Sequence, residues 1–361
     1  MIDSHSFAAA LAPWFVRDAS DRPWRHTRDP YRVWLSEVML QQTQSATVVP
    51  YYEKFAAAYP TVHALAAAPL DQVLKLWEGL GYYSRARNMH RAAQIVAAGG
   101  GQFPQTAALL QNLPGVGRYT AAAVASIVFG ERVAVLDGNV IRVLARLYDL
   151  PADVTMSATQ RHLWALAEGL IAEAERPGDH NQAMMELGSR ICTPRSPDCP
   201  NCPVQTFCRA HANNTQGERP VKARKAKTPH RDVASGVIYD AAGRFLIAQR
   251  PLKGLLGGLW EFPAAFREGD ESLGETLARA LSEQCGIQVE IGDVLATVKH
   301  AFSHFRITLH AHRCRYLGGE IALTRYIAAA WVTPAEVDHY ALARADRRMI
   351  EVLLGRSSPK N

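Results

Sequence analysis

The sequence lacks the long apolar runs and the early basic residues that direct a chain into or across a membrane. No stretch of about 18 apolar residues runs without a charge, Gly or Pro, so we expect no transmembrane helix. The N-terminal stretch contains Asp3 and no early Lys or Arg, so we expect no secretory signal. Internal repeats are also absent, which argues against a repeat architecture. We therefore expect a cytoplasmic chain.

Length and charge narrow the class of protein further. At 361 residues the chain exceeds the usual size of one domain, so we expect two domains, each able to bury a core. Lys and Arg number 40 against 34 Asp and Glu, which gives a net charge of +6. This balance favours an anionic partner such as nucleic acid, although many basic proteins bind no polyanion.

Cysteine is scarce, yet four of the six cysteines fall in one short segment, CTPRSPDCPNCPVQTFC. Disulfides are rare in a reducing cytosol, so clustered thiols there indicate a metal site. The spacing is C-x6-C-x2-C-x5-C, and four thiolates suit either zinc or an iron–sulfur cluster. The four candidate ligands are Cys192, Cys199, Cys202 and Cys208. We expect the two remaining cysteines, Cys285 and Cys314, to be core residues.

The pattern of apolar residues changes along the chain and divides it. Up to about residue 215, apolar residues recur three and four apart, which predicts helices. The stretch ERPVKARKAKTPHR then carries six Lys and Arg and two prolines, and it predicts a linker. Short alternating runs around one helical stretch, LGETLARALSEQ, follow. We therefore expect an all-helical domain at 1–215, a basic linker at 216–230 and an α+β domain at 231–361.

A glycine-rich turn in LQNLPGVGRYTAAAVASIVFG predicts a helix, a tight turn and a second helix. Pro114, Gly115 and Gly117 give the turn its freedom. Such a turn exposes backbone N–H groups and a helix N-terminus, which suits a phosphate. Because turns of this kind are common between helices, the signal is weak by itself.

Two carboxylates in the helical region are candidates for chemistry. Glu37 lies among apolar residues of VWLSEVMLQQTQ, where burial would raise its pKa and let it act as a general acid. The alternative is a Glu on the solvated edge of an amphipathic helix. Asp137 precedes a clear helix in VLDGNVIRVLARL and is, with Asn139, a good helix cap. Capping and a catalytic role can coexist, because a carboxylate at a helix start stays near the surface of a cleft.

Together these stretches resemble the adenine DNA glycosylases of the helix-hairpin-helix superfamily. Five further blocks agree with that family in order and spacing, alongside the cysteine loop: LSEVMLQQTQ, GLGYYSRARN, LPGVGRYTA, VLDGNV and NQAMMELG. The resemblance implies one 4Fe-4S cluster at the four cysteines and removal of adenine mispaired with 8-oxoguanine or guanine in double-stranded DNA. We expect a monomer in the cytosol of a bacterial cell, associated with the nucleoid.

The chemistry that this reaction needs agrees with the candidate residues. Adenine is a poor leaving group as an anion, so an acid must protonate it, and Glu37 is the candidate. Departure leaves an oxocarbenium-like sugar, which the carboxylate of Asp137 can stabilise or trap. The resemblance implies Tyr119 and Asn139 as supporting groups that orient these carboxylates. Glu37 can then act again as the base on the incoming water.

The resemblance also implies how the enzyme reaches the base and whether it cuts the strand. Rotating a base out of the duplex costs a few kcal/mol, so a side chain must fill the gap. Gln42 and Tyr82, with Leu40 near the first, stand where the family has its intercalating residues, although packing between helices is the alternative. Position 119 is a lysine in the endonuclease III branch, where the amine attacks the sugar. Tyr119 therefore predicts a glycosylase without an efficient lyase step.

The second domain resembles the Nudix-like module that ends adenine DNA glycosylases. Aligned on Gly286, the Nudix signature keeps Glu271 and Glu283 but has Ala280 and Gln284 in place of two key carboxylates. Too few oxygen ligands then remain for a hard cation such as magnesium. We therefore expect the Nudix fold without its hydrolase activity.

The segment KHAFSHFRITLH contains the element by which the family reads 8-oxoguanine. The resemblance assigns this role to Phe302, Ser303 and His304, with hydrogen bonds from the latter two. The alternative is an ordinary strand, since apolar and polar side chains alternate there.

Two other functions of the whole chain stay open from the residues alone: a nonenzymatic iron–sulfur protein that binds DNA, and a Nudix nucleotide hydrolase.

Overall fold

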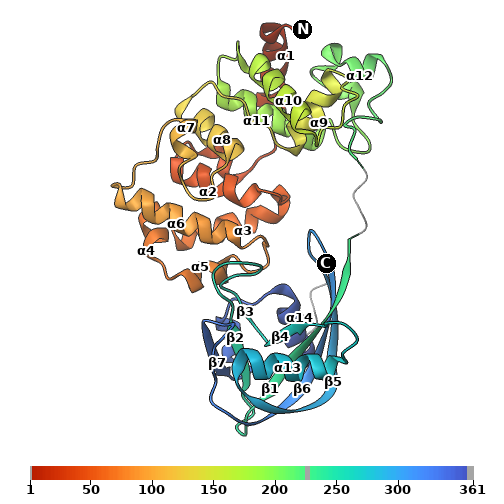
Figure 1. The fold of residues 1–361 in the computed structure, drawn as a ribbon. Helices are drawn as coiled ribbons and strands as arrows, with labels where there is room; N and C mark the ends of the chain where they lie inside the picture. Colours follow the sequence, from red (N-terminus) through yellow and green to blue (C-terminus); the bar gives the residue numbers. More distant parts are fainter. Residues whose placement is uncertain (1, 224–227, 356–361) are drawn as a thin grey trace. The chain divides into compact units, whose positions relative to one another are not determined.

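The computed structural model describes residues 2–223 and 228–355, as a set of helices followed by a sheet with two more helices (Figure 1). Four residues of the expected linker, 224–227, and the last six of the expected second domain lie outside the described residues. The helices of the first part are α1 (Ser4–Asp18), α2 (Pro30–Leu40), α3 (Ser45–Ala58), α4 (Val62–Ala67), α5 (Leu70–Leu76), α6 (Ser84–Ala98), α7 (Ala107–Leu110), α8 (Arg118–Phe129), α9 (Gly138–Leu147), α10 (Ser157–Ile171), α11 (Pro177–Arg190) and α12 (Arg209–Ala212).

The later elements begin at residue 230. They are β1 (His230–Tyr239), β2 (Phe245–Gln249), β3 (Trp260–Glu261), β4 (Ala264–Phe266), α13 (Leu273–Cys285), β5 (Gln288–Ala301), β6 (Arg306–Gly318), β7 (Ala328–Val332) and α14 (Arg344–Leu353). Short 3-10 turns lie at Pro23–His26, Cys199–Asn201, Gln205–Phe207 and Glu336–His339. The expected fold class, a helical domain followed by an α+β domain, is confirmed.

Contacts divide the chain into two compact units. The helical unit combines Met1–Ala67 with Asn88–Lys225, and the sheet unit combines Ala68–Arg87 with Ala226–Asn361. The short segment that carries α5 and Tyr82 therefore belongs to the sheet unit by its contacts. Among the residues that the structure describes, no helix is long and apolar enough to span a membrane.

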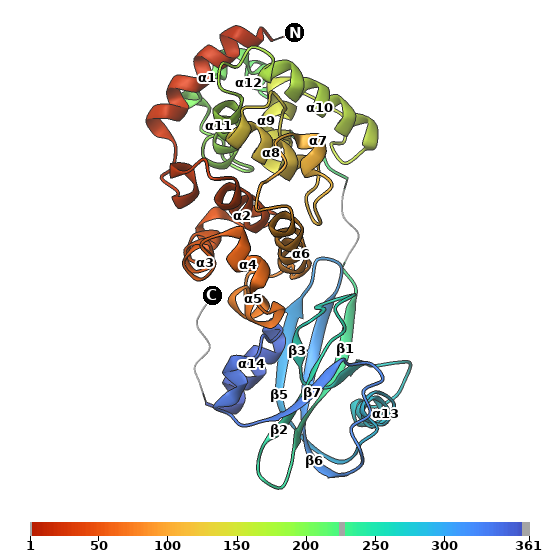
Figure 2. The same ribbon diagram turned by 90° about the vertical axis from the view of Figure 1, so that its left-hand side faces the viewer.

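In the helical unit, α2 is a central helix. Its start is fixed by Pro30 in the first turn and by the carboxylate of Asp29, which accepts a hydrogen bond from the Arg32 amide. Every residue from Val33 to Met39 is buried, so α2 is covered on all sides. It packs against α8, and α11 packs against both α8 and α9 (Figure 2). This packing brings candidate residues of α2, α8 and the start of α9 near one another inside the helical unit.

In the sheet unit, a mixed sheet runs in the order β3-β2-β1-β6-β5, with β4 paired to β1 and β7 paired to β2. The β1–β6 pair is parallel, and the other pairs are antiparallel. Consecutive residues of β1 enter different hydrophobic clusters, since Val237 shares one cluster with Met349 of α14, and Ile238 shares the other with Leu281 of α13. The two helices therefore cover opposite faces of the sheet (Figure 2).

Candidate active site

The side chain of Glu37 is nearly enclosed inside the helical unit. It lies in α2 and is only 4% exposed, so the solvated-edge interpretation is wrong. Burial raises the pKa of Glu37 to about 7, because the charged carboxylate loses its hydration. A hydrogen bond from Tyr119 opposes this rise, the nearby charge of Asp137 adds to it, and Arg25 opposes it. Glu37 can therefore hold or release a proton near neutral pH.

The phenol of Tyr119 contacts Glu37 directly. Tyr119 lies in the first turn of α8, and its hydroxyl donates a hydrogen bond of 2.9 Å to Oε2 of Glu37. The same hydroxyl lies 3.0 Å from the sulfur of Met185 in α11. Burial and the neighbouring carboxylates raise the pKa of Tyr119 well above its usual value, so the phenol keeps its proton. Tyr119 is thus a fixed hydrogen-bond donor to Glu37.

Asp137 is the N-cap of α9, as its place before the helix predicts. Its Oδ1 accepts hydrogen bonds from the amides of Asn139 and Val140 at 2.9 and 2.8 Å, and Oδ2 accepts one from Nδ2 of Asn139 at 3.0 Å. Burial raises the pKa of Asp137, while these donors act in the opposite direction. The carboxylate is therefore fixed in one orientation by three N–H groups.

Two residues that sequence reasoning missed support Asn139. Arg142, one turn further along α9, donates from Nη2 to Oδ1 of Asn139 at 2.8 Å and to the carbonyl of Gly188 at 2.6 Å. An added Cβ on Gly188 of α11 would lie only 2.6 Å from Cβ of Asn139. The signals were the i,i+3 spacing of Asn139 and Arg142, and an isolated glycine inside a helical pattern.

The turn before α8 has the open geometry that its glycines predict. Gly115 has φ +77°, and a Cβ there would meet Cβ of Asn88 at 2.7 Å, so a larger residue does not fit. Gly117 caps α8, and no neighbour lies within 4 Å of a Cβ placed on it. The N-terminus of α8 therefore has space beside it that an approaching phosphate could use.

The two candidate intercalating residues both have left-handed backbones. Gln42, just after α2, has φ 58°, and Tyr82 has φ 46°. Residues other than glycine rarely adopt this conformation, and where they do it is often at functional sites. Leu40 is the last residue of α2 and is half-buried. Gln41, which sequence reasoning missed, anchors this loop because its Nε2 donates to Oγ1 of Thr120 at 2.9 Å.

Residues 302–305 form the turn between β5 and β6, so the ordinary-strand interpretation is wrong for them. Ser303 and His304 are exposed at this turn. The ring of Phe302 packs between His300 and Phe305, each with a centroid distance of 4.7 Å. Within the sheet unit, the hydroxyl of Tyr82 lies 3.0 Å from that of Ser303. Ser303 and His304 therefore lie at an exposed turn that is supported by the packed rings of Phe302 and its neighbours.

The four clustered cysteines line one cavity, together with Arg146 and other loop residues. They are half-buried free thiols, whereas Cys285 and Cys314 are buried in the sheet unit, as expected. Burial raises the pKa of three of the clustered thiols, that of Cys202 to about 12. Within residues 2–223 and 228–355, no three His, Cys, Asp or Glu side chains are grouped as ligands of one metal ion.

Arg146 of α9 organises this loop from inside the helical unit. Its guanidinium is fully buried and donates to the carbonyls of Thr193 and Gln216 at 2.7 and 2.9 Å. Its Nη1 also lies 3.3 Å from Sγ of Cys192. The helix α9 therefore begins at the N-cap Asp137, and near its C-terminal end it holds the cysteine loop through Arg146.

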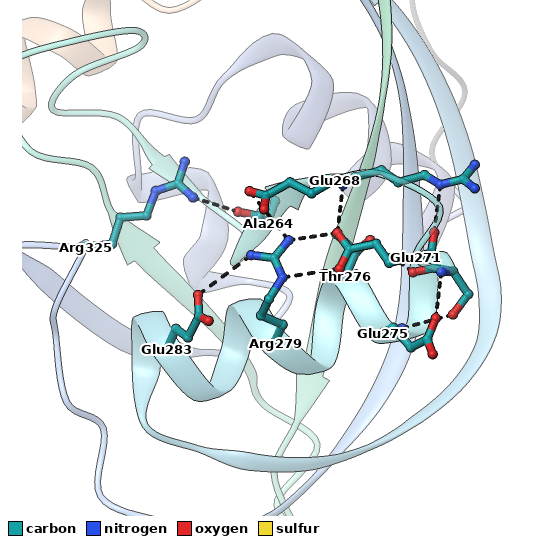
Figure 3. A network of polar contacts seen from close by, with 10 residues as sticks. Ala264, Glu268, Glu271, Glu275, Thr276, Arg279, Glu283 and Arg325 are labelled. Atoms are coloured by element: carbon teal, nitrogen blue, oxygen red, sulfur yellow. Dashed lines mark hydrogen bonds and ion pairs between the residues drawn. The ribbon is translucent and has the colours of Figure 1, made fainter.

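The acidic residues that remain from the Nudix signature form an ion-pair network with Arg279 (Figure 3). The guanidinium of Arg279 donates to both carboxylate oxygens of Glu271 and lies 3.7 Å from Glu268 and from Glu283. These hydrogen bonds lower the pKa of Glu271 to about 2. Ala280 is buried. The remaining carboxylates therefore contact the protein's own cation.

Comparison with known proteins agrees with this fold. Residues 35–168 match the HhH-GPD superfamily of base excision DNA repair proteins, and residues 234–352 match the NUDIX domain. A thermostable thymine-DNA glycosylase has a TM-score of 0.52 at 30% identity, covering 58% of this chain and 97% of its own. Endonuclease III in a trapped covalent intermediate with DNA has a TM-score of 0.50 at 26% identity, covering 59% and 99%.

The fold and these matches define a base excision DNA repair glycosylase of the helix-hairpin-helix class, joined to a Nudix-like domain. The adenine DNA glycosylase of Rattus norvegicus is 37% identical, over 97% of this chain and 78% of the relative. That of Homo sapiens is 37% identical, over 97% and 74%. The chain belongs to the adenine DNA glycosylase family, whose enzymes hydrolyse N-glycosidic bonds.

Proposed function

We propose that this enzyme removes adenine mispaired with 8-oxoguanine or guanine in double-stranded DNA, by hydrolysis and without cutting the strand. The observation that carries the proposal is the 2.9 Å hydrogen bond from Tyr119 to a buried Glu37 whose pKa is about 7. An acid of this strength supplies the proton that adenine needs to depart.

In this mechanism the protonated Glu37 transfers its proton to a ring nitrogen of the extrahelical adenine. The pKa of about 7 is well matched to the task, because an acid works best when its pKa lies near the working pH. Tyr119 holds one carboxylate oxygen in place and leaves the other for the base. After adenine departs, the resulting carboxylate can accept a proton from the attacking water.

Asp137 stabilises the positive charge that develops on the sugar. Its charge is close enough to raise the pKa of Glu37. The amide of Asn139 and two backbone N–H groups keep the carboxylate aimed in one direction. Fixed charge in a buried site stabilises a cationic transition state or a covalent adduct better than mobile solvent does.

The strand stays intact because residue 119 is a phenol. A lyase of this class needs an amine to form a Schiff base with the opened sugar. The hydroxyl of Tyr119 is occupied by Glu37 and Met185, and its pKa is raised well above the usual value. Tyr119 therefore positions the acid instead of attacking the sugar.

Base flipping is assigned to Gln42 and Tyr82, with Leu40 supporting the first. Their left-handed backbones support this role, since such strain is kept where a side chain must be presented in a fixed direction. The turn with Gly115 and Gly117 holds the phosphate next to the flipped nucleotide through backbone N–H groups. Together these groups would open the duplex and fix its register.

Recognition of 8-oxoguanine is assigned to Phe302, Ser303 and His304. Both polar side chains are exposed at the β5–β6 turn and can form hydrogen bonds with the altered edge of the base. The contact between the hydroxyls of Tyr82 and Ser303 supports the idea that the intercalating residue and the residues that recognise 8-oxoguanine act together. The ion pairs of Arg279 support loss of the Nudix hydrolase activity.

The cysteine loop is proposed to hold one 4Fe-4S cluster. The donor set fits it, because four half-buried thiols line one cavity and thiolates are the usual ligands of such a cluster. Four thiolates would also suit a zinc ion, and analysis for iron, sulfide and zinc separates the two. Cys192, Cys199, Cys202 and Cys208 would be its ligands. The cluster's role is to hold the loop, whose Arg195 can meet DNA phosphate.

We also propose that the chain acts as a monomer in the bacterial cytosol, with domains at 1–215 and 231–361 joined by the basic segment 216–230.

The experiment that tests the proposed adenine excision uses duplexes with one 8-oxoguanine·A or G·A pair. Alkali after incubation reveals abasic sites, and the same reaction without alkali reveals any lyase activity. Strand breaks without alkali would refute hydrolysis by a monofunctional enzyme, and an absence of abasic sites would refute the activity.

A further inference from the structure

The loop that carries Tyr82 is built around a buried arginine. Arg85 is only 7% exposed, and its guanidinium lies 5.2 Å from the ring centroid of Trp77 and 5.5 Å from that of Tyr82. Both distances fall within the range of attractive cation–π contacts. One guanidinium therefore supports the ring that is proposed to enter the duplex, while 46% of the surface of Tyr82 remains exposed.

The same guanidinium also fixes the backbone of this loop. Nη2 of Arg85 donates to the carbonyls of Leu80 and Gly81 at 3.2 and 3.1 Å. The indole N–H of Trp77 donates to the carbonyl of Gly81 at 2.9 Å. Gly81 has φ +76° and is followed by Tyr82 at φ 46°, so two consecutive residues are left-handed. These hydrogen bonds stabilise a conformation that tyrosine rarely adopts.

The choice of arginine has a physical reason. Burying a charged group is costly unless it is well bonded, so an apolar side chain would be expected in a position that only fills space. A planar guanidinium can stack on aromatic rings and donate in its plane to two carbonyls at once. A lysine ammonium keeps the charge but is neither planar nor forked.

From this arrangement we infer that Arg85 is a positioning residue for base extrusion, which holds the Tyr82 ring and its left-handed backbone ready before DNA binds. The inference rests on the proposed role of Tyr82 as an intercalating residue. A ring held in advance loses little conformational freedom when it enters the duplex, so opening the pair is easier. Arg85 would then act on extrusion and leave proton transfer by Glu37 unchanged.

The test compares two substrates that differ in whether adenine must be unpaired. One duplex carries a G·A mispair, and the other carries adenine opposite an abasic-site analogue, where no pair holds the base. For Arg85→Lys we expect single-turnover excision to fall about tenfold or more on G·A, since several bonds of a charged group are lost. On the abasic duplex we expect a change of less than about twofold, because chemistry is untouched.

Extrusion is also measured directly. In a Glu37→Gln background, which blocks excision, 2-aminopurine in place of the adenine gives a fluorescence rise when it leaves the stack. Arg85→Lys should slow this rise about as much as it slows excision from G·A. Arg91→Lys in α6, an exposed arginine on the same helix, is the matched control and should behave as the parent protein does.

A double-mutant comparison separates action through Tyr82 from other effects. If Arg85 works through this ring, Arg85→Lys combined with Tyr82→Leu should be no slower on G·A than Tyr82→Leu alone. Multiplied losses in the double variant, or equal losses of Arg85→Lys on both duplexes, would overturn the inference. If Arg85→Lys extrudes the base at the normal rate and Tyr82→Leu extrudes it slowly, the role of Arg85 is overturned, while the proposed intercalating role of Tyr82 stands.

Should Arg85→Lys fail to fold, Trp77→Phe provides the second test. It keeps a ring against the guanidinium but removes the N–H that donates to the Gly81 carbonyl. The same selective loss on G·A is expected, smaller than that of Arg85→Lys because one hydrogen bond is removed. Equal excision by Trp77→Phe and the parent on both duplexes would then refute a pre-formed loop.

Discussion

The hydroxyl of Tyr119 donates a 2.9 Å hydrogen bond to the carboxylate of Glu37, and the two side chains come from different helices, α8 and α2. A phenol with a raised pKa donates and cannot deprotonate at neutral pH, so it favours the carboxylate form of Glu37. Burial favours the neutral form and is the larger effect, which leaves the pKa near 7. The balance of these two effects sets the acid strength and can be altered by mutation.

Replacing Glu37 by Gln should abolish adenine release and leave binding to the duplex largely intact. The amide keeps the shape and can still accept the hydrogen bond from Tyr119, but it has no acidic proton. Phosphate contacts carry most of the affinity and do not involve this residue. The measurements are single-turnover excision and binding to G·A duplexes. Near-normal excision by this variant would remove Glu37 from the acid role.

The same substitution should change stability in a pH-dependent way. The folded-state pKa of Glu37, about 7, lies above the unfolded value near 4.5, so the folded state holds the proton more tightly. Stability from this residue is fully present below pH 4.5 and is lost as pH rises through 7, by roughly 3 kcal/mol in total. Glu37→Gln should therefore gain stability over the parent at pH 8 and lose that advantage near pH 4. Denaturant melts at both pH values measure it.

Tyr119→Phe should move the pH profile of excision to higher pH. Excision needs protonated Glu37, so the rate falls as pH rises through the pKa of that residue. Removing the phenol removes a donor that lowers this pKa, and the falling limb therefore shifts upward. Excision near pH 7 should also slow because the acid is held less firmly. An unchanged profile, measured by single-turnover rates from pH 5 to 9, would contradict the coupling.

Part of this site could be nominated from the sequence: the residue pattern pointed to Glu37 and Asp137 and the family resemblance to Tyr119, and the structure places the Tyr119 hydroxyl against Glu37. The enclosure of Glu37 was not predictable, since it depends on α8 and α11 arriving from far along the chain. The support of Asn139 by Arg142 was not predicted either, because it depends on the carbonyl of Gly188 arriving from another helix. Left-handed φ angles at a glutamine and a tyrosine also go against local preference, so the sequence pattern does not predict them.

Gly188→Ala tests the close approach of α11 to Asn139 in the first turn of α9. The new methyl would lie 2.6 Å from Cβ of Asn139 and 2.9 Å from its carbonyl oxygen, so one helix must shift. We expect a stability loss of about 1–3 kcal/mol and a slower excision step, because Asn139 orients Asp137. Gly169→Ala in α10, where a Cβ meets nothing within 4 Å, is the control and should be neutral or stabilising. Equal behaviour of the two variants in denaturant melts and excision would disprove the packing argument.

The proposed 4Fe-4S cluster of the cysteine loop can be checked by colour and by metal content. Protein with a 4Fe-4S cluster should be yellow-brown and contain iron and acid-labile sulfide. Cys202→Ser should lower the iron content and loosen the loop, whereas Cys285→Ser in the sheet unit should leave iron and colour unchanged. Metal analysis, absorption spectra and thermal melts of the three proteins decide the matter. A colourless and fully active protein that contains zinc would rule the cluster out.

The β5–β6 turn allows recognition to be separated from chemistry. Ser303→Ala with His304→Ala removes two exposed hydrogen-bonding groups of the sheet unit, whereas Glu37 and Asp137 belong to the helical unit. A two-point hydrogen-bonded contact with a base edge contributes about 1–3 kcal/mol of discrimination, so losing both groups should lower the preference for 8-oxoguanine·A over G·A roughly ten- to a hundredfold. Excision from G·A should stay close to that of the parent, because the acid and the stabilising carboxylate are unchanged.

The matched control for this prediction is Ser282→Ala with His339→Ala, which makes the same two chemical changes at exposed positions outside the turn. Tyr82→Phe adds a finer comparison, because it keeps the ring and removes only the hydroxyl that lies 3.0 Å from Ser303. If Ser303 needs that contact to face the damaged base, Tyr82→Phe should lose part of the preference and keep its rate of extrusion. Single-turnover excision and binding on both duplexes, side by side, measure all four proteins. Full preference in the Ser303 and His304 variant would place the reader elsewhere in the chain.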